Sequence, residues 1–164
     1  MLERGEISVL FMGDITLDPL TMNTIKNVYE NSALATDKMD IINYINKYSP
    51  KIIVTTYRYQ MLEYHDIIIA IRAHNPSIKI IMLIREEDCS NMRKILSMGC
   101  CSYVYLGSSQ EKNYERILNA LREARQALNS AKNEEYYNAL LEDSIVSKSD
   151  PQGNITYVND NFTK

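Results

Sequence analysis

The chain has 164 residues, of which 45% are hydrophobic, so it can bury one sizeable core with little left for a second full domain. Its formal net charge is -3 and its 18 lysines and arginines are scattered, which argues against the basic surface of a nucleic-acid-binding protein. No apolar run approaches the roughly 18 residues of a membrane span, and no signal peptide or anchor is recognisable. We therefore expect a cytoplasmic protein that contacts neither nucleic acid nor membrane.

The cysteines and histidines show no metal-binding pattern. Cys89, Cys100 and Cys101 lack the paired spacing of a zinc site, and without secretory features they predict reduced thiols. Neither His65 nor His74 belongs to a cluster of metal-binding side chains. We expect no bound metal and no cofactor.

Strand-like and helical patterns alternate along the chain. Short apolar runs predict strands at 7–12, 52–56, 78–84 and 102–106, with a weaker strand at 32–35. Helical spacing predicts helices at 18–29, 37–48, 64–74 and 89–98, and a long one from 110 to about 143. This alternation predicts an α/β fold, a doubly wound five-stranded parallel sheet followed by a long C-terminal helix and a short β-hairpin-like tail.

Local signals predict where these helices begin and end. Asp18 is a suitable N-cap before Pro19, Asp37 can cap the second helix, and Gly99 fits a C-cap. The expected apolar stripe of the first helix comprises Leu20, Ile25, Val28 and Tyr29. That of the second comprises Met39, Ile42, Ile45 and Tyr48.

The long helix carries a heptad-like seam formed by Ile117, Leu121, Ala124 and Leu128. Its first half must pack on the sheet as the fifth helix of the domain. The part beyond Ala124 outruns such a domain, so we expect residues 125–143 to form a connector helix or coiled coil that makes a homodimer.

The order of elements, with an acidic residue after the first strand and a glycine turn before the last, resembles the response-regulator receiver family, the flavodoxin/CheY-like fold, over residues 5 to 128. The resemblance places a magnesium-binding acidic pair at Gly13 and Asp14, the phospho-accepting aspartate at Thr56, the switch hydroxyl at Ile84 and the conserved lysine at Leu106. Only Asp14 keeps the required chemistry, because the other side chains offer no carboxylate, hydroxyl or cation suited to the task. We read residues 5–124 as a pseudo-receiver, a non-catalytic signalling module that acts through contacts with other signalling proteins.

The last residues, 144–164, resemble the start of a PAS domain. The resemblance rests on a strand, a DxxG turn, a second strand and an Asn-rich helix start, at Ile145, Val146, Asp150, Gly153, Ile155, Tyr157, Val158, Asn159 and Phe162. It implies a longer bacterial-type signal-transduction protein of which this segment is a fragment.

Three alternatives stay open. Asp14 lies where open α/β sheets bind ligands, so the domain is alternatively a working receiver, or a sensor of a cation or small ligand. Cys100 and Cys101 would instead suit a thiol redox sensor. The charge run 85–88 is expected to be a solvated loop, and no Gly-x-Gly-x-x-Gly, Walker or Gly-x-Ser-x-Gly motif points to an enzyme.

Overall fold

The structure is a computed structural model that describes residues 7–143 and 147–158. The chain divides into two compact units, residues 1–124 and residues 125–164.

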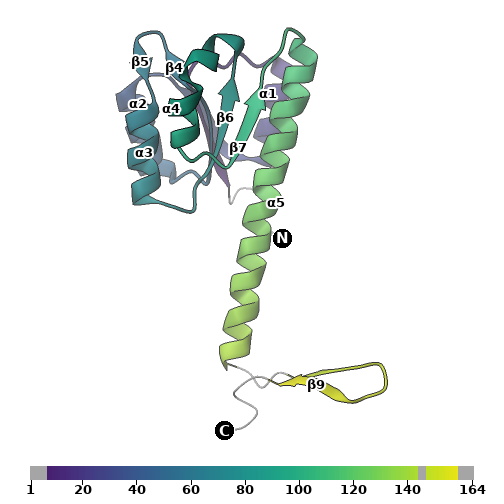
Figure 1. Cartoon of the computed structure of the whole chain (residues 1–164). Coiled ribbons are helices and arrows are strands. Elements are labelled where there is room, and N and C mark those ends of the chain that lie inside the picture. Colours follow the sequence, from purple (N-terminus) through teal and green to yellow (C-terminus); the bar gives the residue numbers. More distant parts are fainter. Residues whose placement is uncertain (1–6, 144–146, 159–164) are drawn as a thin grey trace. The chain divides into compact units, whose positions relative to one another are not determined.

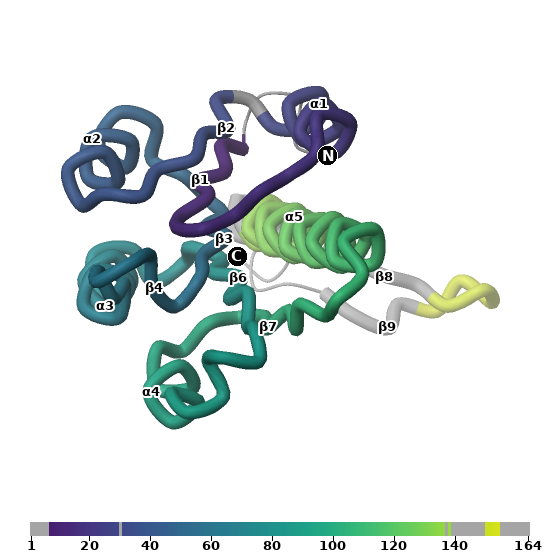
Figure 2. Tube along the Cα trace, turned by 90° about the horizontal axis from the view of Figure 1, so that it is seen from above, coloured from purple at the N-terminus to yellow at the C-terminus, as the bar shows by residue number. Residues whose placement is uncertain are grey.

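The first unit is built on a five-stranded parallel sheet (Figure 1). Its strand order is β2-β1-β3-β6-β7 (Figure 2). The strands are β1 (Ser8–Met12), β2 (Glu30–Ala35), β3 (Ile52–Thr56), β6 (Lys79–Ile84) and β7 (Ser102–Tyr105). Every residue of β1 and β3 is buried, as the continuous apolar runs predict for strands covered on both faces. The alternation of strands and helices therefore does form the doubly wound sheet.

Helices cover both faces of this sheet. They are α1 (Pro19–Val28), α2 (Lys38–Tyr48), α3 (His65–His74), α4 (Met92–Ser97) and the first part of α5 (Gln110–Asp143). Figure 2 shows α1 and α5 on one face and α2, α3 and α4 on the other. The carboxyl ends of all five strands consequently meet at one edge, where open α/β sheets bind ligands.

The predicted helix caps are confirmed. The Asp18 carboxylate accepts a hydrogen bond from the Thr21 N–H at 3.2 Å, and Asp37 accepts one from the Asp40 N–H at 2.9 Å. Hydrogen bonding with the Thr21 side chain and then with its N–H lowers the pKa of the Asp18 carboxyl, and the Asp40 N–H lowers the pKa of the Asp37 carboxyl. Gly99 follows α4 with a φ of +67°, as expected for a residue that ends a helix.

The predicted apolar stripes are partly wrong. Leu20 is 76% exposed and Met39 is 64% exposed, whereas α2 buries Ile41 and Tyr44. Helix α2 has two overlapping apolar stripes, the predicted one and a second that contains Ile41 and Tyr44. The hydrogen bonds of Tyr44 favour burial of the second stripe. The Tyr44 hydroxyl donates to the carbonyls of Val9 and Asn31, so this face of the helix turns inward.

Two local elements were not predicted. A small antiparallel hairpin of β4 (Arg58–Tyr59) and β5 (Leu62–Glu63) follows β3. A 3-10 segment, η1 (Glu86–Asn91), precedes α4, so the α-helix itself is shorter than the predicted span 89–98. Both elements lie at the carboxyl edge of the sheet and shape the candidate site.

The start of α5 packs within the first unit. Ile117, Leu121 and Ala124 are buried there, and the Tyr29 hydroxyl donates to the Leu121 carbonyl at 3.1 Å. These three residues of the predicted seam are therefore occupied by their own domain and are not available to a second chain. Of the four, only Leu128 lies beyond this unit, and it is half-buried.

The second unit contains the rest of α5 and an antiparallel hairpin of β8 (Ser147–Ser149) and β9 (Ile155–Val158). The Asp150 carboxylate orders the turn by accepting hydrogen bonds from the N–H groups of Gln152 and Asn154, at 3.0 and 2.8 Å. Ile145, Val146, Asn159 and Phe162, four residues of the PAS resemblance, lie outside the described residues. Within the described ranges, no helix has the length and apolar character needed to cross a membrane.

Candidate functional site

The carboxyl edge of the sheet brings together all the positions that the receiver resemblance singled out. Gly13 and Asp14 follow β1, Thr56 ends β3, Ile84 ends β6 and Leu106 follows β7. Their surroundings differ, however, and divide the edge into a closed half and an open half.

The closed half lies around Thr56, which is only 4% exposed. Its hydroxyl donates to the Arg58 carbonyl at 3.0 Å, so the β4–β5 hairpin holds the end of β3. Gly13 sits against this side chain with a φ of +103°, and a Cβ at Gly13 would lie 1.9 Å from Thr56 Oγ1. The glycine therefore permits a backbone approach that no other residue allows.

Two fully buried tyrosines, Tyr57 and Tyr64, complete this closure. The Tyr64 ring lies beside Gly13, and its hydroxyl donates to the Thr36 carbonyl at 2.7 Å. The Tyr57 hydroxyl makes no hydrogen bond of acceptable geometry with the described residues, although the Glu63–Lys94 ion pair is near enough to interact with it electrostatically. The position that would carry a phosphoryl group is thus packed with protein atoms.

The open half is organised by an ion pair that the sequence did not reveal. Arg85 directly follows β6, and its guanidinium donates to the Asp14 carboxylate at 3.1 Å and to the Asp14 carbonyl at 2.6 Å. The Asp88 carboxylate accepts from the Arg85 N–H at 2.9 Å and fixes the start of η1. The charge run 85–88 is therefore only partly a solvated loop, because Asp88 is buried and Arg85 joins two strand ends.

A cavity of about 690 Å³ opens beside this ion pair. Its lining includes the apolar residues Ile15, Leu83, Leu106 and Ile117, of which only Leu106 is not buried, and the acidic residues Asp14, Glu86 and Glu87. Tyr105 and Tyr114 complete the aromatic part of the lining. The volume falls in the range of small-molecule sites, roughly 300 to 1,000 Å³.

Side chains of α5 hold the loop that borders this cavity. The Asn113 side-chain amide accepts from the Gly107 N–H and donates to the Gly107 carbonyl, both at 2.9 Å. Arg116 donates to the Tyr105 carbonyl at 3.0 Å. The wall after β7 is consequently fixed to the helix through its backbone.

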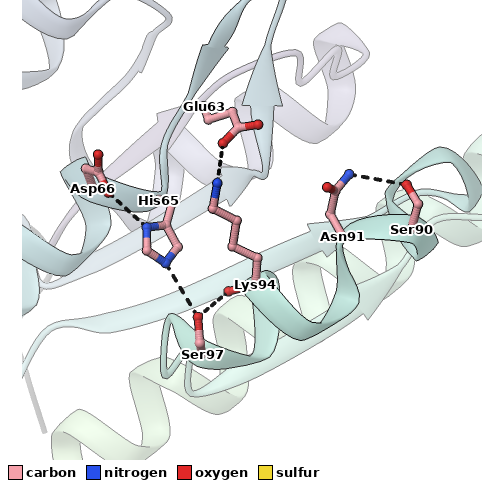
Figure 3. A network of polar contacts seen from close by, with 7 residues as sticks. All are labelled: Glu63, His65, Asp66, Ser90, Asn91, Lys94 and Ser97. Atoms are coloured by element: carbon pink, nitrogen blue, oxygen red, sulfur yellow. Dashed lines mark hydrogen bonds and ion pairs between the residues drawn. The ribbon is translucent and has the colours of Figure 1, made fainter.

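A separate polar network joins the hairpin, α3 and α4 (Figure 3). His65 lies 3.0 Å from Asp66 Oδ1 through Nδ1 and 3.5 Å from Ser97 Oγ through Nε2, in the order of a Ser-His-Asp triad. The Ser97 hydroxyl donates instead to the Lys94 carbonyl at 2.6 Å, and it stands at the carbonyl end of α4, which would repel an oxyanion. The network therefore connects elements, and it does not have the geometry of a hydrolase.

The two neighbouring thiols, Cys100 and Cys101, differ in burial. Burial raises the pKa of Cys100 to about 11, which disfavours its reactive thiolate. The exposed Cys101 thiol donates to the Ile80 carbonyl at 3.1 Å. In the described ranges, no group of three or more His, Cys, Asp or Glu side chains could hold a metal ion.

The geometry of the first unit matches that of known receiver domains. The chemotaxis response regulator CheY4 of Vibrio cholerae is 18% identical, with a TM-score of 0.57, and the match covers 72% of this chain and 98% of that one. The receiver domain of an HD domain-containing protein from Pseudomonas fluorescens Pf-5 is 15% identical, with a TM-score of 0.57 and coverages of 76% and 98%. NtrX from Brucella abortus is 12% identical, with a TM-score of 0.58, and the match covers 76% of this chain and 29% of NtrX.

These similarities establish the fold. No protein-family model matches the chain, and no curated protein matches it. The predicted fold class, the CheY-like five-stranded parallel sheet with a long C-terminal helix, is confirmed. At these low sequence identities the similarity shows the fold alone, and any activity has to be inferred from the residues of the site.

Proposed function

We propose that the first unit is a pseudo-receiver, a signalling module that acts through protein contacts without aspartate phosphorylation and without enzymatic activity. The observation that carries this proposal is the closed half of the carboxyl edge. The residue at the phospho-accepting position is a buried threonine whose hydroxyl is bonded to the Arg58 carbonyl. A threonine hydroxyl neither binds magnesium as a carboxylate does nor forms an acyl phosphate.

The Arg85–Asp14 pair supports the same proposal. In working receivers, the first-strand carboxylates hold a magnesium ion. Here the single remaining carboxylate is neutralised by a guanidinium of the same chain, with two hydrogen bonds from Arg85 to Asp14. A fixed internal cation needs neither metal nor phosphate, so the arrangement of these strand ends does not depend on phosphorylation.

The proposal is tested by incubating the full chain with magnesium and acetyl phosphate, and separately with beryllofluoride. We expect no added mass of phosphate and no saturable amide shifts at Asp14, Thr56 or Ile84. A stable phosphoprotein would overturn the proposal. Magnesium shifts that disappear in Asp14→Asn would instead establish a cation sensor.

We further propose that the chain forms a homodimer through residues 125–143 and that residues 144–164 begin a PAS domain of a longer cytoplasmic signalling protein. Leu128, the one seam residue beyond Ala124, supports the dimer, and the Asp150-centred turn supports the PAS segment. The free cysteines among the described residues fit a reducing compartment. Sedimentation of Leu128→Lys, with exposed Gln126→Lys as the matched control, tests the dimer. We expect only the Leu128 variant to become monomeric; a monomeric parent chain would contradict this part.

A further inference from the structure

The cavity beside Arg85 has a mixed polar and apolar lining, in which Leu106, Tyr105 and Tyr114 are the partly or largely exposed apolar and aromatic residues. Ile15, Leu83 and Ile117 are buried residues that contribute to its lining, and Tyr105 and Tyr114 add ring surface. Sites lined in this way bury the apolar body of a small ligand, while a few polar groups fix its orientation. Tyrosine rings also present negative faces, which attract cations.

The charges around the cavity favour a positively charged ligand. Asp14, Glu86 and Glu87 contribute three carboxylates to the lining, against the one guanidinium of Arg85. That guanidinium is already bonded to Asp14. Among the described residues, Glu86 and Glu87 form no ion pair, so two carboxylates remain for an incoming cation. An anionic ligand would instead meet net negative charge.

We propose that this cavity binds a small organic cation with a flat apolar body, such as an amidinium or guanidinium group attached to a ring. The flat body lies against the exposed surface of Tyr105, Tyr114 and Leu106, and the cationic head faces Glu86 and Glu87. The inference goes beyond the proposed function, because it depends on the open half of the carboxyl edge and not on whether the position of Thr56 can be phosphorylated. The phosphorylation test and the binding test can therefore fail independently.

The test uses three probes of nearly the same shape that differ in charge: benzamidine, benzamide and benzoate. Each is titrated into the full chain while the amide signals of Gly107, Ser108 and Asn113, which border the cavity, are followed by NMR. We expect saturable shifts with benzamidine, weaker binding of benzamide and no saturable shift with benzoate. Shifts from benzoate of similar affinity, or no shift at these amides with any probe at millimolar concentration, would overturn the proposal.

Substitution of the two free carboxylates provides the second readout. The double variant Glu86→Gln, Glu87→Gln should weaken benzamidine binding about three- to tenfold, as expected for two exposed charge interactions, and leave benzamide binding unchanged. Glu115→Gln, on the exposed surface of α5 outside the lining, is the matched control and should bind benzamidine as the parent does. Equal benzamidine affinity in the double variant and the parent would contradict the assigned role of these carboxylates.

Discussion

The two halves of the carboxyl edge differ in how densely their residues are packed. Around the end of β3, a hairpin, a tyrosine and a glycine pack against Thr56 and leave it 4% exposed. Around the ends of β6 and β7, a cavity of about 690 Å³ remains open, with the Asp14–Arg85 pair in its lining. The comparison teaches that one edge of a single sheet can be densely packed around one strand end and hollow around two others.

The largest change in stability is expected from a substitution that adds a side chain at Gly13, where the backbone lies against Thr56 in the closed half. Gly13→Ala places a Cβ 1.9 Å from Thr56 Oγ1 and forces an alanine to a φ of +103°. We expect a loss of about 2–5 kcal/mol in unfolding free energy, from overpacking together with backbone strain.

Urea unfolding of Gly99→Ala is the control for this variant. Gly99 also has a positive φ, of +67°, but a Cβ there meets nothing within 4 Å. Its loss should be only the strain of about 1–2 kcal/mol. If both variants lose the same stability, the close packing around Gly13 is not rigid.

The two buried tyrosines give a sharper test of the closed half. Tyr64→Phe removes the hydroxyl that donates to the Thr36 carbonyl and should cost about 1–2 kcal/mol. Tyr57→Phe removes a buried hydroxyl without a hydrogen-bond partner among the described residues, so it should be neutral or slightly stabilising. Thermal unfolding of both variants measures the difference, and an equal loss in the two would show that the Tyr57 hydroxyl is bonded.

A smaller effect is expected in the open half. Arg85→Lys keeps the charge but cannot hold the Asp14 carboxylate and carbonyl together, so it should lose about 0.5–1 kcal/mol, the typical range for a partly exposed pair. A double-mutant cycle with Asp14→Asn measures the coupling. A coupling indistinguishable from zero would mean that the ion pair does not hold the two strand ends together.

The pH dependence should reveal the buried tyrosines. Burial raises the pKa of Tyr44 and of Tyr64 to about 12, from an ordinary value of 10. Above pH 10 the unfolded chain releases these protons first, so the stability contributed by the two tyrosines should be constant below about pH 10 and fall as the pH rises toward 12. Cys100, whose pKa is also raised by burial, adds a separate fall that begins near pH 9. Denaturant unfolding from pH 8 to 11.5 measures the fall, which should be shallower in Tyr64→Phe; an unchanged slope in this variant would contradict the raised pKa of Tyr64.

Much of the fold was predictable because strands and helix caps are local. The continuous apolar runs of β1, β3 and β6 and the caps at Asp18 and Asp37 each need only a few neighbouring residues to be recognised. The faces of α1 and α2 were less predictable, since the exposure of Leu20 and Met39 depends on which side of each helix meets the sheet. Periodicity alone does not choose between overlapping stripes.

The location of the candidate site was predictable from the sequence, but the contacts between its residues were not. The sequence placed Gly13, Asp14, Thr56, Ile84 and Leu106 at one edge of the sheet, where the structure brings them together. It gave no sign that Arg85 bonds to Asp14, because the two residues are 71 positions apart. The β4–β5 hairpin also went unrecognised, as each of its strands has only two residues.

The contact between Gly13 and Thr56 also bears on how this domain can evolve. A carboxylate at position 13 needs a Cβ, and that atom would lie 1.9 Å from Thr56 Oγ1, so a single substitution there carries a heavy penalty in stability. The side chain at position 56 must shrink or move before position 13 can accept an acidic residue. An acidic pair at positions 13 and 14 therefore requires at least two substitutions in a fixed order, the first of which brings no chemical gain by itself.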